Sequence, residues 1–577
     1  MKNRMMILLS TILILTMLLS VIVSTSLANP LIMGSKFSAV SSNYFATQAA
    51  FEVLQKGGTA ADAAFALAAT IGVTECWFSG VLSGGTWALY YEAASDKVYA
   101  LDGVSWTGTH ATTEFFRDPD VKAYGMHQAN VPGAWDGWMK WLDRFGSKDL
   151  GELMSRAIEL ADNGAPASKG MVSAISRQQD DILRMPHTKA IFMPEGKPPQ
   201  LGEVIYQKDM ANTLRSLVKA YDDNLKNGRS AAFQAANDYF YRGPIAEKIV
   251  AFSKENGGHF ELSDFHESNV EGIVEPISID YKGITVYECP PNSQGITTLM
   301  ALNILKGYDF SQYKIDSPEV IHLIVEALKL AHVDKYYYIA TPDFYDNPVA
   351  ELLSDEHAAK QRARISMDNA LIWPMEGGLG DYQTPRIERG NTTTFSVVDQ
   401  YGNAAAVTTS LGYNLLVVGD TGININNRVR MFEIAEGNPN IVEPRKKVRH
   451  TSNPYMAFKD GKLYICGGNT GADFQPQGQV QQFIRVVEFG LDPQTAVSLP
   501  RYETLAFPNV SAPHLAPNEL RMEAGFPPET IKALEEMGHL MRGVGIVGSA
   551  QMTVIDQEKG IIMLGADPRN ESAGLAW

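Results

Sequence analysis

The stretch NTTTFSVVD, which occupies residues 391–399, has the composition of a β-strand. Its threonines, valines and phenylalanine are β-branched or aromatic, the residue types that favour strands. Gly402 and Asn403 then provide a turn before a second apolar run, AAAVTT, at residues 404–409. The pattern therefore predicts a β-hairpin, and a purely structural hairpin is its simplest interpretation.

The same stretch has a second interpretation, a masked nucleophile. A threonine hydroxyl is a weak nucleophile unless a base lies beside it, and an N-terminal threonine can use its own α-amine as that base. Because these threonines lie deep inside the chain, such a nucleophile would form only after the chain cut itself. The residues alone leave both interpretations open.

Composition describes a large globular protein. The chain has 577 residues, of which 45% are apolar and 20% are charged, which suits a large buried core and argues against disorder. A formal net charge of −16 argues against nucleic acid or an anionic membrane as partner. The charge is better explained as a solvated surface.

Residues 1–28 have the pattern of a signal peptide. Lys2 and Arg4 precede an almost wholly apolar run over 5–23, and Ser26-Leu27-Ala28 then puts small residues at the two positions that a signal peptidase reads. We expect cleavage after Ala28 and export to the periplasm or the exterior. The alternative is an uncleaved membrane anchor, since the apolar run is nearly long enough to span a bilayer.

The side chains that commonly bind metals are sparse. Cys76, Cys289 and Cys466 are widely spaced and form no CxxC pair, so we expect three buried thiols. His322 and His332 lie on one expected helix without nearby cysteines or carboxylates, which favours a structural role over metal binding. We expect no metal and no cofactor.

Apolar periodicity and capping residues place the main elements before the hairpin. Thr59 and Asp62 form an acidic variant of a capping box at the start of the second helix. The segment 371–390, rich in glycine and broken by Pro385, is expected to be a mobile loop. The expected elements are helices at 47–56, 60–69, 296–305 and 321–338, a helical region at 131–163, a mostly helical region at 168–275, and a strand at 87–92.

The hairpin sequence NTTTFSVVDQYGNAAAVTTS resembles the processing junction of γ-glutamyltransferases, which are N-terminal-nucleophile hydrolases. GGTAADAAFA at 57–66, PPNSQG at 290–295 and GGNTGAD at 467–473 extend the resemblance, which runs from about Phe45 to the C-terminus. It implies an α+β fold, a four-layer αββα sandwich. It also implies self-cleavage between Asn391 and Thr392, giving a large subunit of 29–391 and a small subunit of 392–577 that share one fold.

The resemblance also assigns roles to residues. Thr392 would be the nucleophile, and Ser410 would supply a hydroxyl that bonds it. The backbone N–H groups of Gly471 and Ala472 would stabilise the oxyanion, although the family usually has two glycines there, and alanine has less freedom at positive φ. The substrate-binding positions that it implies are Asn427, Arg428, Arg430, Thr451 and Ser452.

Departures from the family pattern concern the acyl donor. γ-Glutamyl-specific members hold the α-carboxylate of the substrate with an arginine, and this chain has Val104 at that position. They hold the α-ammonium of the substrate with acidic or amide groups, and this chain has Arg428 and Arg430 at those positions. Since cations repel an ammonium and pair with a carboxylate, we expect a small amide or peptide substrate whose acyl group lacks an α-amine and carries a carboxylate. Relatives in the wider family act on glutaryl side chains of cephalosporins and on oxamate. The alternatives are a true γ-glutamyltransferase or glutathione hydrolase, and a catalytically idle relative with a binding or structural role.

Overall fold

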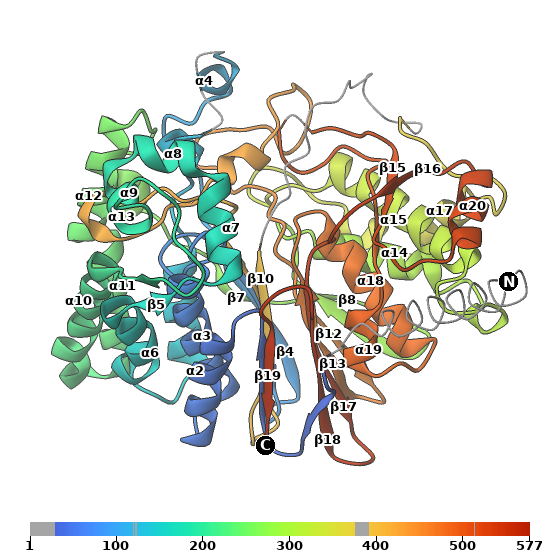
Figure 1. Ribbon diagram of the computed structural model, residues 1–577, viewed down its shortest axis with the longest axis horizontal. Coiled ribbons are helices and arrows are strands. Elements are labelled where there is room, and N and C mark those ends of the chain that lie inside the picture. The colour runs from blue at the N-terminus through green and yellow to red at the C-terminus, as the bar shows by residue number, and fades with distance from the viewer. Residues whose placement is uncertain (1–28, 119–120, 122–123, 375–391, 513) are drawn as a thin grey trace, which may run out of the picture.

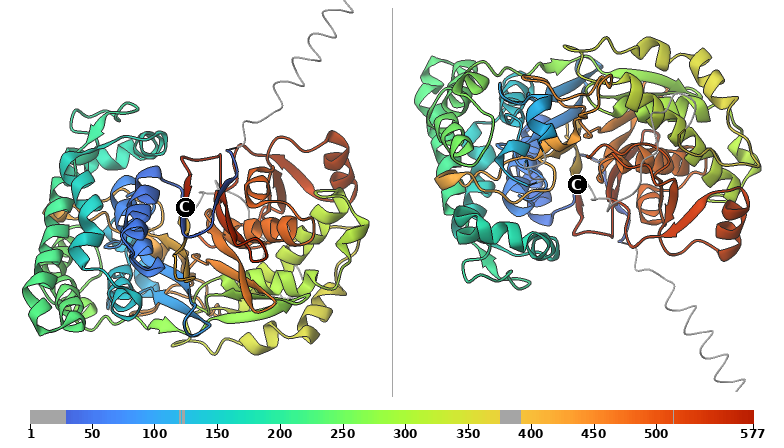
Figure 2. Two further views of the ribbon diagram at one scale, coloured as in Figure 1. Left: turned by 90° about the horizontal axis from the view of Figure 1, so that it is seen from below. Right: turned by 90° about the horizontal axis from the view of Figure 1, so that it is seen from above.

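The computed structural model describes residues 29–118, 121, 124–374, 392–512 and 514–577. Two seven-stranded antiparallel sheets stack face to face, and helices cover both outer faces (Figure 1). Figure 2 shows the same helical layers on opposite sides of the sheets from below and from above. The fold is the expected four-layer αββα sandwich.

Both sheets combine strands from before and after residue 391. One sheet has the order β1 (Ile32–Gly34), β18 (Ile561–Ala566), β17 (Ala550–Asp556), β13 (Lys462–Asn469), β12 (Tyr455–Lys459), β9 (Ile284–Glu288) and β8 (Ile277–Tyr281). The other has the order β19 (Ala573–Ala576), β2 (Ser38–Ser41), β10 (Thr393–Val398), β11 (Ala404–Ser410), β3 (Gly85–Glu92), β4 (Lys97–Gly103) and β7 (Gly272–Val274). The expected hairpin is present as β10 and β11, at the centre of the second sheet.

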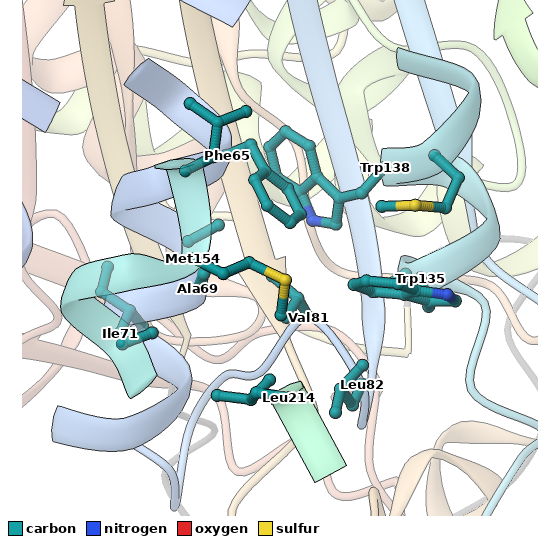
Figure 3. Packing of buried hydrophobic residues seen from close by; sticks show 14 of the residues in the cluster. Phe65, Ala69, Ile71, Val81, Leu82, Trp135, Trp138, Met154 and Leu214 are labelled. Carbon is teal, nitrogen blue, oxygen red and sulfur yellow. The ribbon is translucent and has the colours of Figure 1, made fainter. Parts of the chain in front are cut away.

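The first helical layer packs on the second sheet. Its main helices are α2 (Tyr44–Gln55), α3 (Ala60–Thr74), α5 (Ala134–Phe145) and α6 (Leu150–Asn163). Phe65 lies edge-on to Trp138, with ring centroids 5.7 Å apart, and Met154 lies beside them in the same core (Figure 3). The capping box of Thr59 and Asp62 is present at the start of α3. This helix continues past the expected end at residue 69 because the following TIGVT run is also buried, and packing outweighs the weaker helix propensity of its β-branched residues.

The second helical layer covers the first sheet. Its central helices are α14 (Gly295–Leu305), α15 (Pro318–Tyr338) and α18 (Phe474–Val487). Leu302 and Phe483 from these helices pack with Ile465 from β13. Between the two sheets lies a separate apolar core that includes Trp87 and Cys466.

Several other expectations are confirmed. All three cysteines are buried and free, and His322 and His332 are buried within α15. The expected loop at 371–390 and the signal peptide at 1–28 fall largely or wholly outside the described residues. No helix in the described part of the chain combines the length and apolarity needed to cross a membrane.

Candidate active site

Thr392 lies immediately before β10, at the edge of the space between the sheets, and only 4% of its surface is exposed. The hairpin register pairs Thr393 with Thr409, so Thr392 comes opposite Ser410. The Thr392 hydroxyl donates a long hydrogen bond to Ser410 Oγ at 3.4 Å, and Gln475 Nε2 donates to Thr392 Oγ1 at 3.1 Å. The expected pairing of Thr392 with Ser410 is therefore present.

Alternation along β10 sends neighbouring threonines to opposite faces of the sheet. Thr394 faces the other sheet, since a Cβ on Gly468 of β13 would meet its Oγ1 at 2.3 Å. Thr393 faces the helical layer, where its hydroxyl donates to Glu75 Oε2 at 2.8 Å. The residue next to Thr392 is thus tied to the end of α3.

The loop between β13 and α18 carries the expected oxyanion donors. Gly471 has a φ of +107° and Ala472 has a φ of +53°, a left-handed conformation that disfavours side chains. No described residue accepts a hydrogen bond from either backbone N–H. Behind the loop, Lys335 Nζ pairs with Asp473 Oδ1 at 2.5 Å in a buried contact. The loop therefore has free donors and a rigid support.

A cavity of about 710 Å³ opens onto these groups. Thr392, Gly471 and Ala472 line one end, and the aromatic rings of Trp77 and Phe78 line another part of its wall. Such a volume is typical of small-molecule sites. The candidate nucleophile and the two residues of the oxyanion loop thus border one space that is large enough for a substrate.

Glu75 also borders this cavity, although sequence reasoning gave it no role. Its Oε2 accepts hydrogen bonds from the hydroxyls of Ser42 and Thr393, both at 2.8 Å. Burial raises the pKa of Glu75 to about 7, although the two hydroxyls act in the opposite direction. A carboxyl group that changes charge near neutral pH therefore lies beside the strand of the candidate nucleophile.

Arg428, in the short 3-10 helix η5 (Arg428–Met431), is 2% exposed. Its Nη1 donates to Met431 Sδ, a weak acceptor, at 3.2 Å and makes a long contact to Thr451 Oγ1 at 3.4 Å. Among the described residues, its Nε and Nη2 have no hydrogen-bond partner. Burial, and secondarily Arg430, lower the pKa of Arg428 to about 9, so the guanidinium stays protonated at neutral pH.

His450 supplies a second unpaired donor near Arg428. Its Nδ1 accepts from the backbone N–H of Ser452 at 3.2 Å, which leaves the proton of the neutral ring on Nε2. Burial, and secondarily Arg428, hold the pKa of His450 well below its usual range. Its Nε2 has no partner in the described part of the chain and lies beside Gly85, which pairs with Ser410.

The other expected binding residues lie near Arg428 in sequence or in contact with its neighbours, and none of them lines the large cavity. Asn427 donates its backbone N–H to the carbonyl of Leu411, the residue after Ser410, at 3.0 Å. The Ser452 hydroxyl is buried without a partner among the described residues, and Arg430 is half-buried. Gln294 links Thr451 to the oxyanion loop by donating to the carbonyls of Thr451 at 2.7 Å and Ala472 at 2.9 Å. The structure thus gathers the expected residues on two sides of Thr392, while Asn391 falls outside the described residues.

One buried cluster has the composition of a metal site. His322, Glu326 and His539 bring three ligand atoms within 4.8 Å of one another. Their atoms are already paired, however, because His322 Nδ1 lies 2.9 Å from His539 Nε2 and Lys329 Nζ binds Glu326 Oε1 at 2.7 Å. A buried ammonium beside the carboxylate disfavours a cation, so the cluster is better explained as a structural network.

Three functional candidates were missed by sequence reasoning, Gln475, Glu75 and His450. Gln475 lies three residues beyond the oxyanion loop, at the start of α18, so its proximity to that loop was a usable signal. His450 directly precedes Thr451 and Ser452, two of the expected binding residues, which was a usable signal as well. Glu75 reaches the site from a segment that is distant in sequence from Thr392, and nothing local in its surroundings distinguishes it from other polar residues.

Comparison with known proteins adds to this geometry. The gamma-glutamyltranspeptidase family model matches residues 46–577. The chain is 33% identical over 557 residues to the glutathione hydrolase-like YwrD proenzyme of Bacillus subtilis (strain 168), covering 95% of this chain and 99% of that protein. It is 28% identical to the oxamate amidohydrolase proenzyme of Klebsiella pneumoniae, covering 93% and 98%. The crystal structure of the cephalosporin acylase from Bacillus halodurans is similar, with a TM-score of 0.83, 29% identity and coverage of 95% and 97%.

Proposed function

The chain belongs to the gamma-glutamyltranspeptidase family and is an N-terminal-nucleophile amidohydrolase or acyltransferase, and we propose that Thr392 is its nucleophile, released by self-cleavage after Asn391. The buried contacts of the Thr392 hydroxyl with Ser410 and Gln475 support this assignment. Cleavage there would give a large subunit of 29–391 and a small subunit of 392–577. Because strands from both join the same sheets, the two would remain one folded unit.

In the proposed reaction, the free α-amine of Thr392 takes the proton from its own hydroxyl, and the oxygen attacks the amide carbonyl. The N–H groups of Gly471 and Ala472 stabilise the oxyanion of the tetrahedral intermediate. The ammonium then gives its proton to the leaving amine, and the acyl group stays on Thr392. Water or an acceptor amine attacks that ester and regenerates the enzyme.

The proposed acyl donor has a carboxylate and no α-amine. The observation that carries this proposal is the buried Arg428 guanidinium, whose Nε and Nη2 have no partner among the described residues. An unpaired buried charge is strongly unfavourable, whereas a guanidinium and a carboxylate form two parallel hydrogen bonds. The unpaired Nε2–H of His450 would donate to the same anion.

The position of this pocket suits a short acyl chain. Arg428 follows Asn427, which bonds the residue after Ser410, and Thr451 is linked to the oxyanion loop through Gln294. An acyl group bound to Thr392 would therefore point its far end toward Arg428, while the leaving amine would occupy the large cavity. The name of the Klebsiella relative supports such a donor, since oxamate is an amide with a carboxylate and no α-amine.

The experiment compares glutaryl and γ-glutamyl anilides on the processed protein. N-terminal sequencing should first show that the small fragment begins Thr-Thr-Thr-Phe. We expect a higher kcat/KM for the glutaryl compound, and Arg428→Gln should lower it about 30-fold or more, since removing one partner of a buried charge pair costs about 2–5 kcal/mol.

The matched control is Arg445→Gln, which removes a partly exposed arginine paired with Glu267 and should leave the preference unchanged. Equal or faster turnover of the γ-glutamyl compound by the wild type would contradict the altered donor. It would favour a true γ-glutamyltransferase or glutathione hydrolase instead.

We also propose that the protein is exported, with residues 1–28 removed. The supporting observation is the basic start, apolar run and small-residue end of this segment.

A further inference from the structure

Cleavage before Thr392 would create a charge that needs a partner. The new α-amine is an ammonium in part of its cycle, and a cation in an enclosed site is unfavourable unless it is paired. The two side chains that contact the Thr392 hydroxyl, Ser410 and Gln475, are both neutral. A carboxylate at this end of the cavity would supply the opposite charge that these neutral groups lack.

Glu75 is placed to be that partner. Its Oε2 is held by Thr393, the residue after Thr392, and by Ser42, so the carboxyl group has a fixed position beside the start of β10. Its Oε1 makes no hydrogen bond with a described residue. Glu75 and Thr392 both line the cavity, so the two residues border a shared space.

The other charged groups around Glu75 do not compete for this role. It forms no ion pair with any residue in the described part of the chain, and Glu571 acts on it as a like charge. Cys76, its neighbour in sequence, has a pKa that burial raises to about 12, so the thiol is neutral. Lys169, Arg177 and Arg569 line the same cavity without contacting the carboxylate.

We propose that Glu75 is a positioning residue, whose carboxylate receives a hydrogen bond from the α-amine of Thr392 and orients that amine toward the Thr392 hydroxyl. This inference rests on the proposed function. The proton that leaves the hydroxyl goes to the amine, the carboxylate pairs with the ammonium so formed, and the proton later leaves with the product amine. Glu75 itself forms no covalent bond and needs no other reactant.

The consequence is a specific effect on pH dependence. A free α-amine titrates near pH 8, and a neighbouring carboxylate raises its pKa by favouring the ammonium. Because the amine must be neutral to act as a base, activity falls as pH drops through this pKa. Glu75→Gln keeps the size and one acceptor oxygen for Ser42 and Thr393 but removes the charge. The acid limb of kcat/KM should therefore move to lower pH by about one unit.

The matched control is Glu503→Gln, which removes the same charge from the same cavity, where Glu503 pairs with Arg521 and is not among the charges that act on Glu75. Its acid limb should stay within about 0.3 pH units of the wild type, since screened, distant charges have small effects. Equal shifts in both variants would show a general field of the cavity and would overturn the inference. The inference would also be overturned if processed Glu75→Gln had a lower kcat but an acid limb of kcat/KM at the same pH as the wild type. A residue with a merely structural role would give that result.

If Glu75→Gln folds but stays uncut, Glu75→Asp decides the question. The retained carboxylate should restore cleavage and an acid limb within about 0.5 pH units of the wild type. The inference would be overturned if Glu75→Asp remained uncut. It would also be overturned if the cut variant had an acid limb of kcat/KM more than about 0.5 pH units from that of the wild type. An intact, active wild type would instead contradict the proposed function, so the two failures are distinguishable.

Discussion

Replacing Arg428 by methionine should stabilise the ligand-free protein while removing its preferred substrate. Arg428 is 2% exposed, and its Nε and Nη2 have no partner among the described residues. Each buried unsatisfied group costs about 1–3 kcal/mol, whereas the two contacts of Nη1 return about 1 kcal/mol each at most. Methionine has a similar length and no polar atoms, so the net gain should be about 1–4 kcal/mol.

The assay is calorimetric unfolding of the processed protein. For a chain of this length, about 1 kcal/mol shifts Tm by about 1 °C, so Arg428→Met should unfold about 1–4 °C higher than the wild type. Glutarate, which mimics the expected acyl group, should stabilise the wild type by about 2.7 kcal/mol at one hundred times its Kd and should leave the variant unchanged. Arg428→Met would thus have a higher Tm than the wild type and a smaller increase in Tm on adding glutarate.

Arg449→Met is the matched control, because Arg449 is equally buried and its Nη1 is paired, although its Nε, like that of Arg428, has no partner among the described residues. Its Nη1 donates to the backbone carbonyls of Lys335, Tyr336 and Ile339 at 3.1–3.2 Å. Its loss should lower stability by about 1–3 kcal/mol, since the carbonyls lose their donor. A similar loss in Arg428→Met, or an equal glutarate shift in wild type and Arg428→Met, would refute the carboxylate pocket.

Two further predictions concern the nucleophile and the oxyanion loop. Thr392→Ala should remain one chain on a denaturing gel and lack amidase activity. Thr393→Ala should still be cut, because the hydroxyl of Thr393 contacts Glu75 rather than the scissile site. Two fragments from Thr392→Ala would show that the nucleophile is misassigned. Ala472→Gly should keep kcat/KM within about threefold of the wild type. It should change the free energy of unfolding by less than about 1 kcal/mol, because relief of the left-handed φ of +53° is offset by the greater freedom of glycine in the unfolded chain. A large loss of activity with an intact fold would show that the alanine methyl group, rather than the N–H alone, is needed.

The sequence predicted the elements whose causes are local. The β10–β11 hairpin follows from alternating β-branched residues and a turn, and its register alone places Thr392 opposite Ser410. The start of α3 follows from the capping box of Thr59 and Asp62. In each case the determining residues lie within a few positions of the feature that they specify.

The surroundings of the nucleophile could not be predicted in the same way. Glu75 reaches β10 only because α3 packs across the second sheet, and no pattern near residue 75 indicates that its carboxyl group faces Thr393. Likewise, two arginines in a loop most often face solvent, yet Arg428 is buried and Arg430 is half-buried. Burial of a charge depends on what the rest of the chain places around it, which requires the fold.

The division between local and distant causes has a consequence for specificity. Thr392 and Ser410 lie at a central hairpin of one sheet, where a backbone change would disturb the neighbouring strands, whereas Arg428 lies in the short η5 turn outside both sheets. Substitutions in that turn can therefore alter the acyl group that binds without moving the reacting hydroxyl. Since an unpaired Arg428 lowers stability, its presence is better explained by a ligand than by folding. We expect the donor preference to depend on this turn and the rate of acyl transfer to depend on the hairpin.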